Sequence, residues 1–152
     1  MLAILTPTRF LAKRREDEAN GRYRGITGVL LRGLTLFFSI IFILMGLAGL
    51  IPTFVHHQLL FNFFSVGSFH ELVYIVTGLI GLSASTSTRY ARVYFKAFGI
   101  LYALVAIFGF ALNGNLGFVH VNLANSLFHL IIAVFFLYFG FTSTIAVATH
   151  FD

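Results

Sequence analysis

Charged residues divide this chain into long uncharged stretches. No Asp, Glu, Lys or Arg occurs between Arg32 and Glu71, between Glu71 and Arg89, or between Lys96 and Asp152. A helix needs about 20 mostly apolar residues to cross the hydrocarbon core of a membrane. We therefore predict four membrane-spanning helices at residues 33–54, 67–85, 92–112 and 122–147, the first ending near Pro52. The expected fold class is all-α, an integral membrane four-helix bundle.

The composition agrees with lipid as the solvent for these stretches. Of the 152 residues, 59% are hydrophobic and 10% are charged, whereas soluble domains usually carry about 25% charged residues. A soluble fold with 20 Phe would expose large apolar patches. The absence of Cys excludes disulfides and thiolate metal sites. The charges form no stripe on a soluble fold, so nucleic acid is not an expected partner.

The positions of the basic residues predict the orientation of the spans. All of them lie in residues 1–32 or around the connection between the second and third spans. Lys and Arg are retained on the cytoplasmic side of a membrane, so both segments, and with them both chain ends, are expected there. The ten basic residues are Arg9, Lys13, Arg14, Arg15, Arg22, Arg24, Arg32, Arg89, Arg92 and Lys96.

Residues 1–32 are interpreted as a basic cytoplasmic N-terminal arm, and residues 33–152 as the four-helix transmembrane domain. Pro7 limits any helix that begins before it. One interpretation of the arm is an anchor that lies on anionic lipid at the membrane surface. The other is a docking arm for a partner protein. Either role would use the basic residues Arg9, Lys13, Arg14 and Arg15, beside the apolar residues Leu2, Ile4, Leu5, Phe10 and Leu11.

The two halves of the transmembrane domain resemble each other. A Phe-His pair opens both the second and the fourth span, ending at His70 and His129, and a glycine follows eleven residues later, at Gly81 and Gly140. The offset is 59 residues in both cases. Each repeat would contain two helices and enter the membrane from the same side, as parallel repeats do. The repeat predicts that the two histidines lie at equal depth, close to the outer interface.

A polar cluster opens the fourth span. At 100° per residue, Asn122, Asn125 and His129 fall within about 60° of one another, with Ser126 on the flank. In the second span, His70 and Tyr74 share a face with small residues. Small residues let helices approach, and polar side chains form hydrogen bonds across the contact. One interpretation is therefore a packing seam in which an Asn caps the fourth helix.

The two histidines also permit cofactor chemistry, because ionisable groups inside a membrane mark functional sites. His70 and His129 are candidate ligands for the iron of a haem or the magnesium of a chlorophyll. Alternatively, His70 and Glu71 would relay protons, although Glu71 does not share the helix face of His70. A metal centre built on the pair would need a third firm ligand, which His56, His57 or His120 in the outer loops could supply, and no residue is assigned as a metal ligand. The outer segment 55–66 is apolar and is expected to lie in the interface.

These features together resemble a known family. They are the four spans, the Gly-Leu-Ile-Pro sequence at 49–52, a His followed by a glycine-rich second helix, and the pattern Asn122-x-x-Asn125-x-x-x-His129. Over residues 28–138 the chain is similar to small bacterial membrane proteins grouped as a domain of unknown function (four-three-eight-three). That family has no established activity. The resemblance implies a fold and a bacterial membrane, and it implies no catalytic residues and no arm.

Two classes of function compete. No set of nucleophile, base and acid and no phosphate-binding loop occurs in the sequence, so we do not expect an enzyme. The first expectation is an accessory or assembly subunit that packs against a larger membrane protein complex or forms a homo-oligomer, surrounded by membrane lipids. The alternative is a cofactor-binding membrane module that uses His70 and His129, with haem, chlorophyll or a metal. The expected location is a bacterial plasma membrane or an internal photosynthetic membrane.

Overall fold

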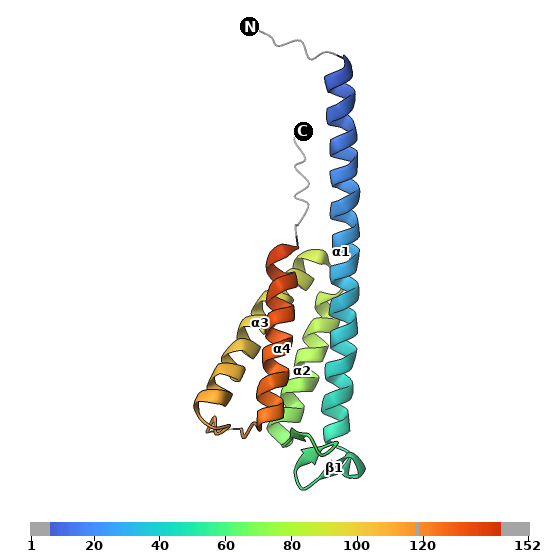
Figure 1. Cartoon of the computed structure of the whole chain (residues 1–152). Helices are drawn as coiled ribbons and strands as arrows, with labels where there is room; N and C mark the ends of the chain where they lie inside the picture. Colours follow the sequence, from blue (N-terminus) through green and yellow to red (C-terminus); the bar gives the residue numbers. More distant parts are fainter. Residues whose placement is uncertain (1–6, 118, 144–152) are drawn as a thin grey trace.

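The computed structural model describes residues 7–117 and 119–143, and within them the chain is mostly helical. Four helices follow in order: α1 (Pro7–Gly49), α2 (Ser68–Ala84), α3 (Thr88–Ala111) and α4 (Leu123–Thr142). Figure 1 shows them side by side, with successive helices running in opposite directions. Leu2, Ile4 and Leu5 of the expected arm lie outside the described residues. The predicted helical architecture is confirmed.

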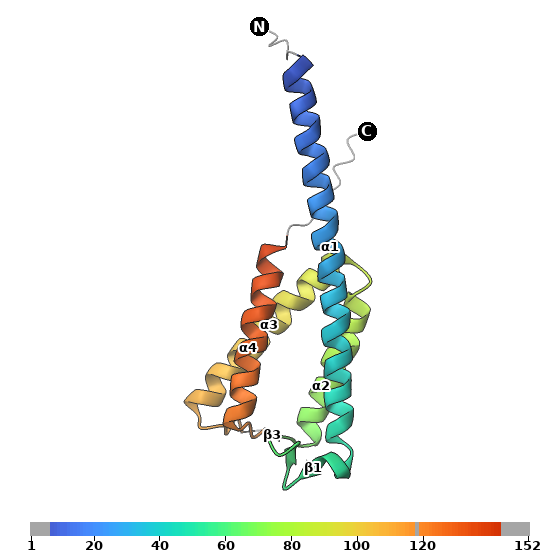
Figure 2. The same cartoon turned by 45° about the vertical axis from the view of Figure 1, so that its right-hand side comes forward.

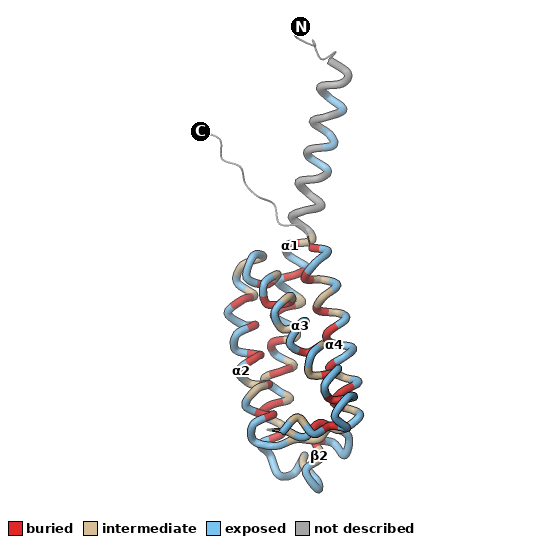
Figure 3. The backbone as a smooth tube through the Cα atoms, turned by 90° about the vertical axis from the view of Figure 1, so that its left-hand side faces the viewer, coloured by how far each residue is buried: buried red, intermediate tan, exposed pale blue. Residues whose placement is uncertain are grey.

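Three of the helices are long and apolar enough to cross a membrane: the Thr27–Gly49 part of α1, α3 and α4. The fourth, α2, is apolar but has only 17 residues. Large apolar side chains such as Phe37, Ile107 and Ile131 are exposed on the outer faces. Figure 3 shows the same pattern, with buried positions facing the centre of the bundle. Such a surface is stable in hydrocarbon and not in water, so the chain is a membrane protein.

Several helix ends differ from the predicted spans. The first span was expected to reach residue 54, but α1 ends at Gly49, and a single 3-10 turn, η1 (Pro52–Phe54), follows. The ring of Pro52 removes a backbone donor, which stops the helix there. The third helix begins at Thr88, four residues earlier than expected, and the fourth ends at Thr142 instead of 147.

The bundle consists of two tightly packed helical hairpins, α1 with α2 and α3 with α4. Glycines allow the close approach. A Cβ atom on Gly78 of α2 would lie 2.7 Å from the Ser39 carbonyl oxygen of α1, and one on Gly46 would lie 2.8 Å from the Glu71 carbonyl oxygen. In the second hairpin, Gly99 of α3 packs against α4 in the same way. Small residues bring helix backbones together in membranes, where packing replaces the hydrophobic effect.

Aromatic rings fill the space between the hairpins. The rings of Phe42 and Tyr102 stack at 5.5 Å between centroids, and Phe95 meets Phe136 edge to face at 4.6 Å. All four rings are at most 2% exposed. These contacts join α1 to α3 and α3 to α4, so the core of the bundle is built largely from aromatic packing.

The connection between α1 and α2 contains a small antiparallel sheet that the sequence analysis did not predict. It comprises β1 (Val55–His56), β2 (Leu59–Leu60) and β3 (Phe64–Ser65) in the order β1-β2-β3. Both residues of its two-residue turn, His57-Gln58, have positive φ, as do the first two residues of its three-residue turn, Phe61 and Asn62. Tight hairpin turns usually contain Asn-Gly or Asp-Gly, and neither of these turns does. The apolar segment expected to lie in the interface therefore forms a small sheet.

The arm and the first span are one helix. α1 continues without a break across residue 32, and its 43 residues correspond to about 65 Å. Figures 1 and 2 show the N-terminal part extending well beyond the bundle, roughly along the line of the helix. Arg15 is exposed, and the side chains of Arg9, Lys13 and Arg14 lie outside the described part of the chain.

Basic side chains tie the helices together at the end of the bundle opposite the sheet. The Arg32 Nε–H of α1 donates to the Ser85 carbonyl oxygen after α2, at 2.9 Å. The Arg92 Nε–H of α3 donates to the Gly140 carbonyl oxygen near the end of α4, at 3.1 Å. Both bonds bring a cation to carbonyl groups at a helix C-terminus, where positive charge is favourable.

Candidate functional site

The two histidines on which the sequence analysis focused meet inside the bundle. His70 lies in the first turn of α2 and His129 in α4, and their ring centroids are 5.8 Å apart with planes inclined by 22°. They are 5% and 2% exposed. Each hairpin therefore contributes one buried imidazole to a shared pair at the end of the bundle near the sheet.

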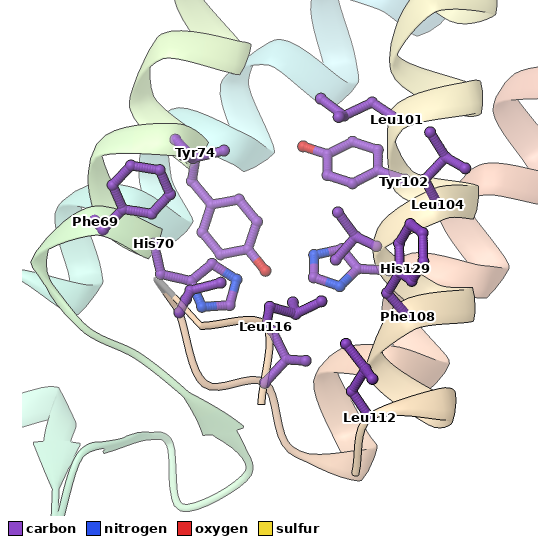
Figure 4. Close-up of a pocket in the computed structure, with 14 residues that line it drawn as sticks. Phe69, His70, Tyr74, Leu101, Tyr102, Leu104, Phe108, Leu112, Leu116 and His129 are labelled. Carbon is purple, nitrogen blue, oxygen red and sulfur yellow. The ribbon is translucent and has the colours of Figure 1, made fainter. Parts of the chain in front are cut away.

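Two tyrosines complete a cluster of four polar rings. Tyr74, one turn after His70 in α2, has its ring centroid 4.9 Å from that of His70 and 6.4 Å from that of His129. Tyr102 of α3 stacks on His129 at 5.2 Å, with planes only 13° apart. In Figure 4 the Tyr74 hydroxyl points toward the space between the two imidazoles. Three helices thus contribute to the cluster.

A cavity of about 470 Å³ borders this cluster. It lies between α2 and α3, which make few contacts with each other and diverge toward the sheet end in Figures 1 and 2. None of the described residues that line it is charged. The other lining residues are apolar: Phe69, Val73, Leu101, Leu104, Val105, Phe108, Leu112, Leu116, Val119 and Val121. Cavities of this size and character are typical of small-molecule sites.

The polar atoms of the cluster are buried without hydrogen-bond partners among the described residues. These atoms are Nδ1 of His70, Nδ1 of His129 and the hydroxyl oxygens of Tyr74 and Tyr102. The Tyr74 hydroxyl approaches Asn125, the Tyr102 hydroxyl approaches Thr77 and the His70 ring approaches the backbone of Ser65, but the hydroxyls and the Nδ1 atoms form no hydrogen bond of good geometry. Leaving a buried polar group unpaired costs about 1–3 kcal/mol, so four of them around one cavity call for a functional explanation.

Two asparagines at the start of α4 hold the segment that precedes α2 against α4. The side chain of Asn125 bonds both backbone groups of Ser65: its Oδ1 accepts from Ser65 N–H at 2.8 Å, and its Nδ2 donates to Ser65 O at 3.1 Å. Asn122 caps α4 by accepting from Asn125 N–H, and its Nδ2 donates to Phe63 O at 2.6 Å. These bonds fix the segment that leads into α2 against α4, and so they place His70 opposite His129.

The sequence profile of a family described as Domain of unknown function (DUF4383) matches residues 32–142. That range is most of the chain and contains the whole ring cluster. The chain belongs to this family. The resemblance predicted from the spans, the histidines and the asparagine pattern is confirmed, while no curated protein and no solved structure matches the chain. Most of the extension of α1 precedes the matched range, whereas the residues that line the cavity lie within it.

The DUF4383 domain does not bring every predicted polar residue into this site. Ser126 packs against Gly109 of α3 and donates to the Asn122 carbonyl oxygen at 3.2 Å. Glu71 faces α1, where a Cβ atom on Gly49 would meet its side chain. Glu71 is 6% exposed and does not line the cavity. The sequence analysis anticipated that it would not share the face of His70.

The outer histidines do not join the pair. Within residues 7–117 and 119–143, no three His, Asp or Glu side chains gather in a way that would hold a metal ion. His56 and His57 lie on the small sheet and its first turn, and His120 borders a separate, more polar cavity with Asn122 and Ser126. The third ligand that a metal centre would require is therefore not supplied by these loops.

Tyr102 and the apolar wall of α3 are the parts of the site that sequence reasoning missed. A weak signal was present, because Gly99, Tyr102, Ala106 and Gly109 follow helical spacing and are all buried on one face of α3. A tyrosine among small residues on such a face indicates packing against a neighbouring helix. The pattern does not reveal which ring it stacks on.

Proposed function

We propose that this DUF4383 protein is a non-catalytic, membrane-embedded binding module that holds an uncharged, lipid-soluble small molecule at His70 and His129. The observation that carries the proposal is that four residues with buried, unpartnered polar atoms, His70, Tyr74, Tyr102 and His129, all line one otherwise apolar cavity. A ligand with polar groups at one end would satisfy them, while its apolar part would occupy the remaining space. The imidazoles and phenols of the wall can form hydrogen bonds with a bound molecule.

A haem with both histidines as iron ligands fits this geometry poorly. The Tyr74 ring lies 4.9 Å from one imidazole and 6.4 Å from the other. It therefore lies beside the pair, closer to His70, in space that a porphyrin held between the two imidazoles would have to occupy. Haem also carries two propionates, and no cationic side chain lines the described wall of the cavity. Both points favour an uncharged ligand.

The ligand would enter sideways from the lipid. Leu101, Leu104 and Phe108 on α3 line the cavity and are each more than 40% exposed. They belong both to the cavity and to the outer surface of the bundle, so the opening lies between α2 and α3 and not at an aqueous end. A lateral opening suits a molecule that is already dissolved in the membrane.

We further infer a topology of four spans with both chain ends in the cytoplasm of a bacterium. The 17 residues of α2 correspond to about 25 Å, close to the thickness of the hydrocarbon core. Arg32, Arg92 and Lys96 lie at the end of the bundle away from the sheet, and positive residues favour the cytoplasmic side. The hairpins would be parallel repeats, as supported by similar contacts 59 to 60 residues apart: Gly78 packs on the backbone near Ser39, and Leu137 packs on Gly99.

A second candidate function, an accessory subunit of a larger membrane complex, is favoured by one observation. α1 extends beyond the bundle as a helix and does not fold back across it. A helix that leaves the membrane is suited to docking a partner protein, whereas a surface anchor would turn along the membrane. Removal of residues 1–20 should abolish co-purification of any partner, and retention of the partner by the truncated chain would contradict this role.

The binding proposal is tested by filling the cavity. Val105 lines it, whereas Ile107, two residues later on α3, is 58% exposed on the outer face. Wild type, Val105→Trp and Ile107→Trp would be extracted from native membranes in polymer-bounded discs and their small molecules identified by absorption and mass spectrometry. We expect a stoichiometric ligand in wild type and Ile107→Trp, and its loss in Val105→Trp. A protein that carries no ligand in any of the three would overturn the proposal.

A further inference from the structure

We propose that an anionic phospholipid binds in a groove at the end of the bundle opposite the sheet, with its phosphate at Arg32. The groove lies between α1 and the connection from α2 to α3, far along the bundle from the cavity at the histidines. Figure 1 shows this connection beside the point where α1 leaves the bundle. The groove has a volume of about 420 Å³ and is lined by Val29, Arg32, Gly33, Leu36, Ser85 and Thr86.

Arg32 supplies the groove with hydrogen-bond donors for an anion. Its Nε–H donates to the Ser85 carbonyl oxygen at 2.9 Å, which fixes the direction of the side chain. A guanidinium has five N–H groups, and Arg32 has no other hydrogen-bond or ion-pair partner among the described residues. The remaining N–H groups form a planar fork that matches two oxygens of a phosphate.

The charges of the bundle are separated in a way that favours an anion at this end. Residues 27–143 contain a single acidic residue, Glu71, which lies in the first turn of α2 at the sheet end. Two of the basic residues already have partners on α4, because Arg92 donates to a carbonyl oxygen there and Lys96 lies over an aromatic ring. Arg32 is the cation that lines the groove, and cations at the cytoplasmic surface of a membrane attract anionic lipids.

The apolar floor of the groove favours a phospholipid over free phosphate. Val29 and Leu36 are 71% and 41% exposed, and a Cβ atom on Gly33 would meet nothing within 4 Å. Leu36 lies one turn beyond Arg32 toward the interior of the membrane, and the exposed Ile40 continues the same face of α1. An acyl chain would lie along these side chains while the phosphate stays at the guanidinium. A free phosphate would leave that surface uncovered.

Two hydroxyl groups of the groove suit a head group that carries hydroxyls of its own. The Ser85 hydroxyl donates to the Leu82 carbonyl oxygen at 2.7 Å, and the Thr86 hydroxyl donates to the Ser83 carbonyl oxygen at 2.8 Å. Both protons are therefore used, and both oxygens can still accept. A glycerol head group can donate to them, whereas choline cannot, so phosphatidylglycerol is the probe that matches the groove.

The test measures lipid binding to the full chain in a neutral detergent by native mass spectrometry, with phosphatidylglycerol and phosphatidylcholine added at equal concentration. Arg92→Gln is the matched control for Arg32→Gln, because Arg92 also donates from Nε to a carbonyl oxygen at this end but does not line the groove. We expect Arg32→Gln to weaken binding of phosphatidylglycerol about tenfold, the effect of hydrogen bonds lost from a charged group. Arg92→Gln should stay within about twofold of wild type. The basic arm is unchanged in both variants, so its attraction for anionic lipid cancels in the comparison.

Filling the groove tests the same site without a change of charge. Gly33→Phe places a ring where a Cβ atom has no neighbour, and Leu44→Phe, on the exposed surface of α1 outside the groove, is its control. We expect Gly33→Phe to lose the preference for phosphatidylglycerol over phosphatidylcholine and Leu44→Phe to keep it. An excess of inorganic phosphate should displace none of the lipid, because it makes no contact with the apolar floor.

Three results would overturn the site. Equal loss of binding in Arg32→Gln and Arg92→Gln would show a general attraction of the basic end, and unchanged binding in both Arg32→Gln and Gly33→Phe would place the lipid elsewhere. Displacement by inorganic phosphate would assign the groove to a free anion. The cavity at the histidines takes no part in these measurements, so the proposed binding function stands or falls separately.

Discussion

The side chain of Asn125 forms two hydrogen bonds with the backbone of Ser65, one to its N–H and one from its Nδ2 to the carbonyl oxygen. Ser65 lies five residues before His70, and Asn125 lies one turn before His129. The amide therefore connects the segment that leads into α2 with the first turn of α4. This clamp sets the relative depth of the two helices, on which the meeting of the histidines depends.

The clamp predicts a specific loss of stability in Asn125→Leu. The substitution leaves both backbone groups of Ser65 without their partner at a partly buried position. We expect the free energy of unfolding to fall by about 2 kcal/mol and the melting temperature in detergent by about 5 °C. Asn115→Leu, which removes only a bond from Gly117 N–H in an exposed turn, is the control and should change the melting temperature by much less.

Two glycines of α1 and α2 should respond in opposite ways to the same substitution. A Cβ atom on Gly78 would press on the backbone of α1 at Ser39 and Ile43, whereas one on Gly33 would meet nothing within 4 Å. We expect Gly78→Ala to destabilise the bundle by about 1–3 kcal/mol. Gly33→Ala should be neutral or stabilising by up to about 1 kcal/mol, because alanine favours helix. Equal effects in thermal unfolding would contradict the close packing of α1 on α2.

The meeting of His70 and His129 can be detected by cross-linking. The chain has no Cys, so a His70→Cys/His129→Cys variant contains a single pair of thiols. With a short bifunctional thiol reagent we expect an intramolecular link, seen as one band after cleavage at a protease site inserted at Asn115. Glu71→Cys paired with His129→Cys should remain two fragments, because Glu71 faces Gly49 of α1. Efficient linking of that control pair would contradict the arrangement.

The topology predicts which side of the membrane reaches each loop. Asn115 lies at the sheet end of the bundle in the turn between α3 and α4, and Thr86 lies in the connection between α2 and α3. In intact cells a membrane-impermeant maleimide should label Asn115→Cys and leave Thr86→Cys unlabelled until the cells are opened. The reverse pattern would show that the basic residues face outward.

The sequence by itself determined that the helices are membrane helices, and it gave their positions to within a few residues. Long stretches without charge are a property of the chain alone, and they identify membrane helices whatever the neighbours are. The sequence likewise singled out His70, His129 and the asparagines at the start of α4, because a polar residue in such a stretch is conspicuous. The family resemblance rested on the same features.

Only the tertiary structure decided which side chains share a site. The contact of Tyr102 with His129 and the opening between α2 and α3 depend on the rotation and tilt of whole helices. In a chain so uniformly apolar, many rotations would bury similar side chains, so periodicity does not select one. The sequence did not predict the sheet between α1 and α2 for a related reason. Its turns adopt positive φ at His57, Gln58, Phe61 and Asn62 without an Asn-Gly or Asp-Gly pair, and contacts with the rest of the fold decide that conformation.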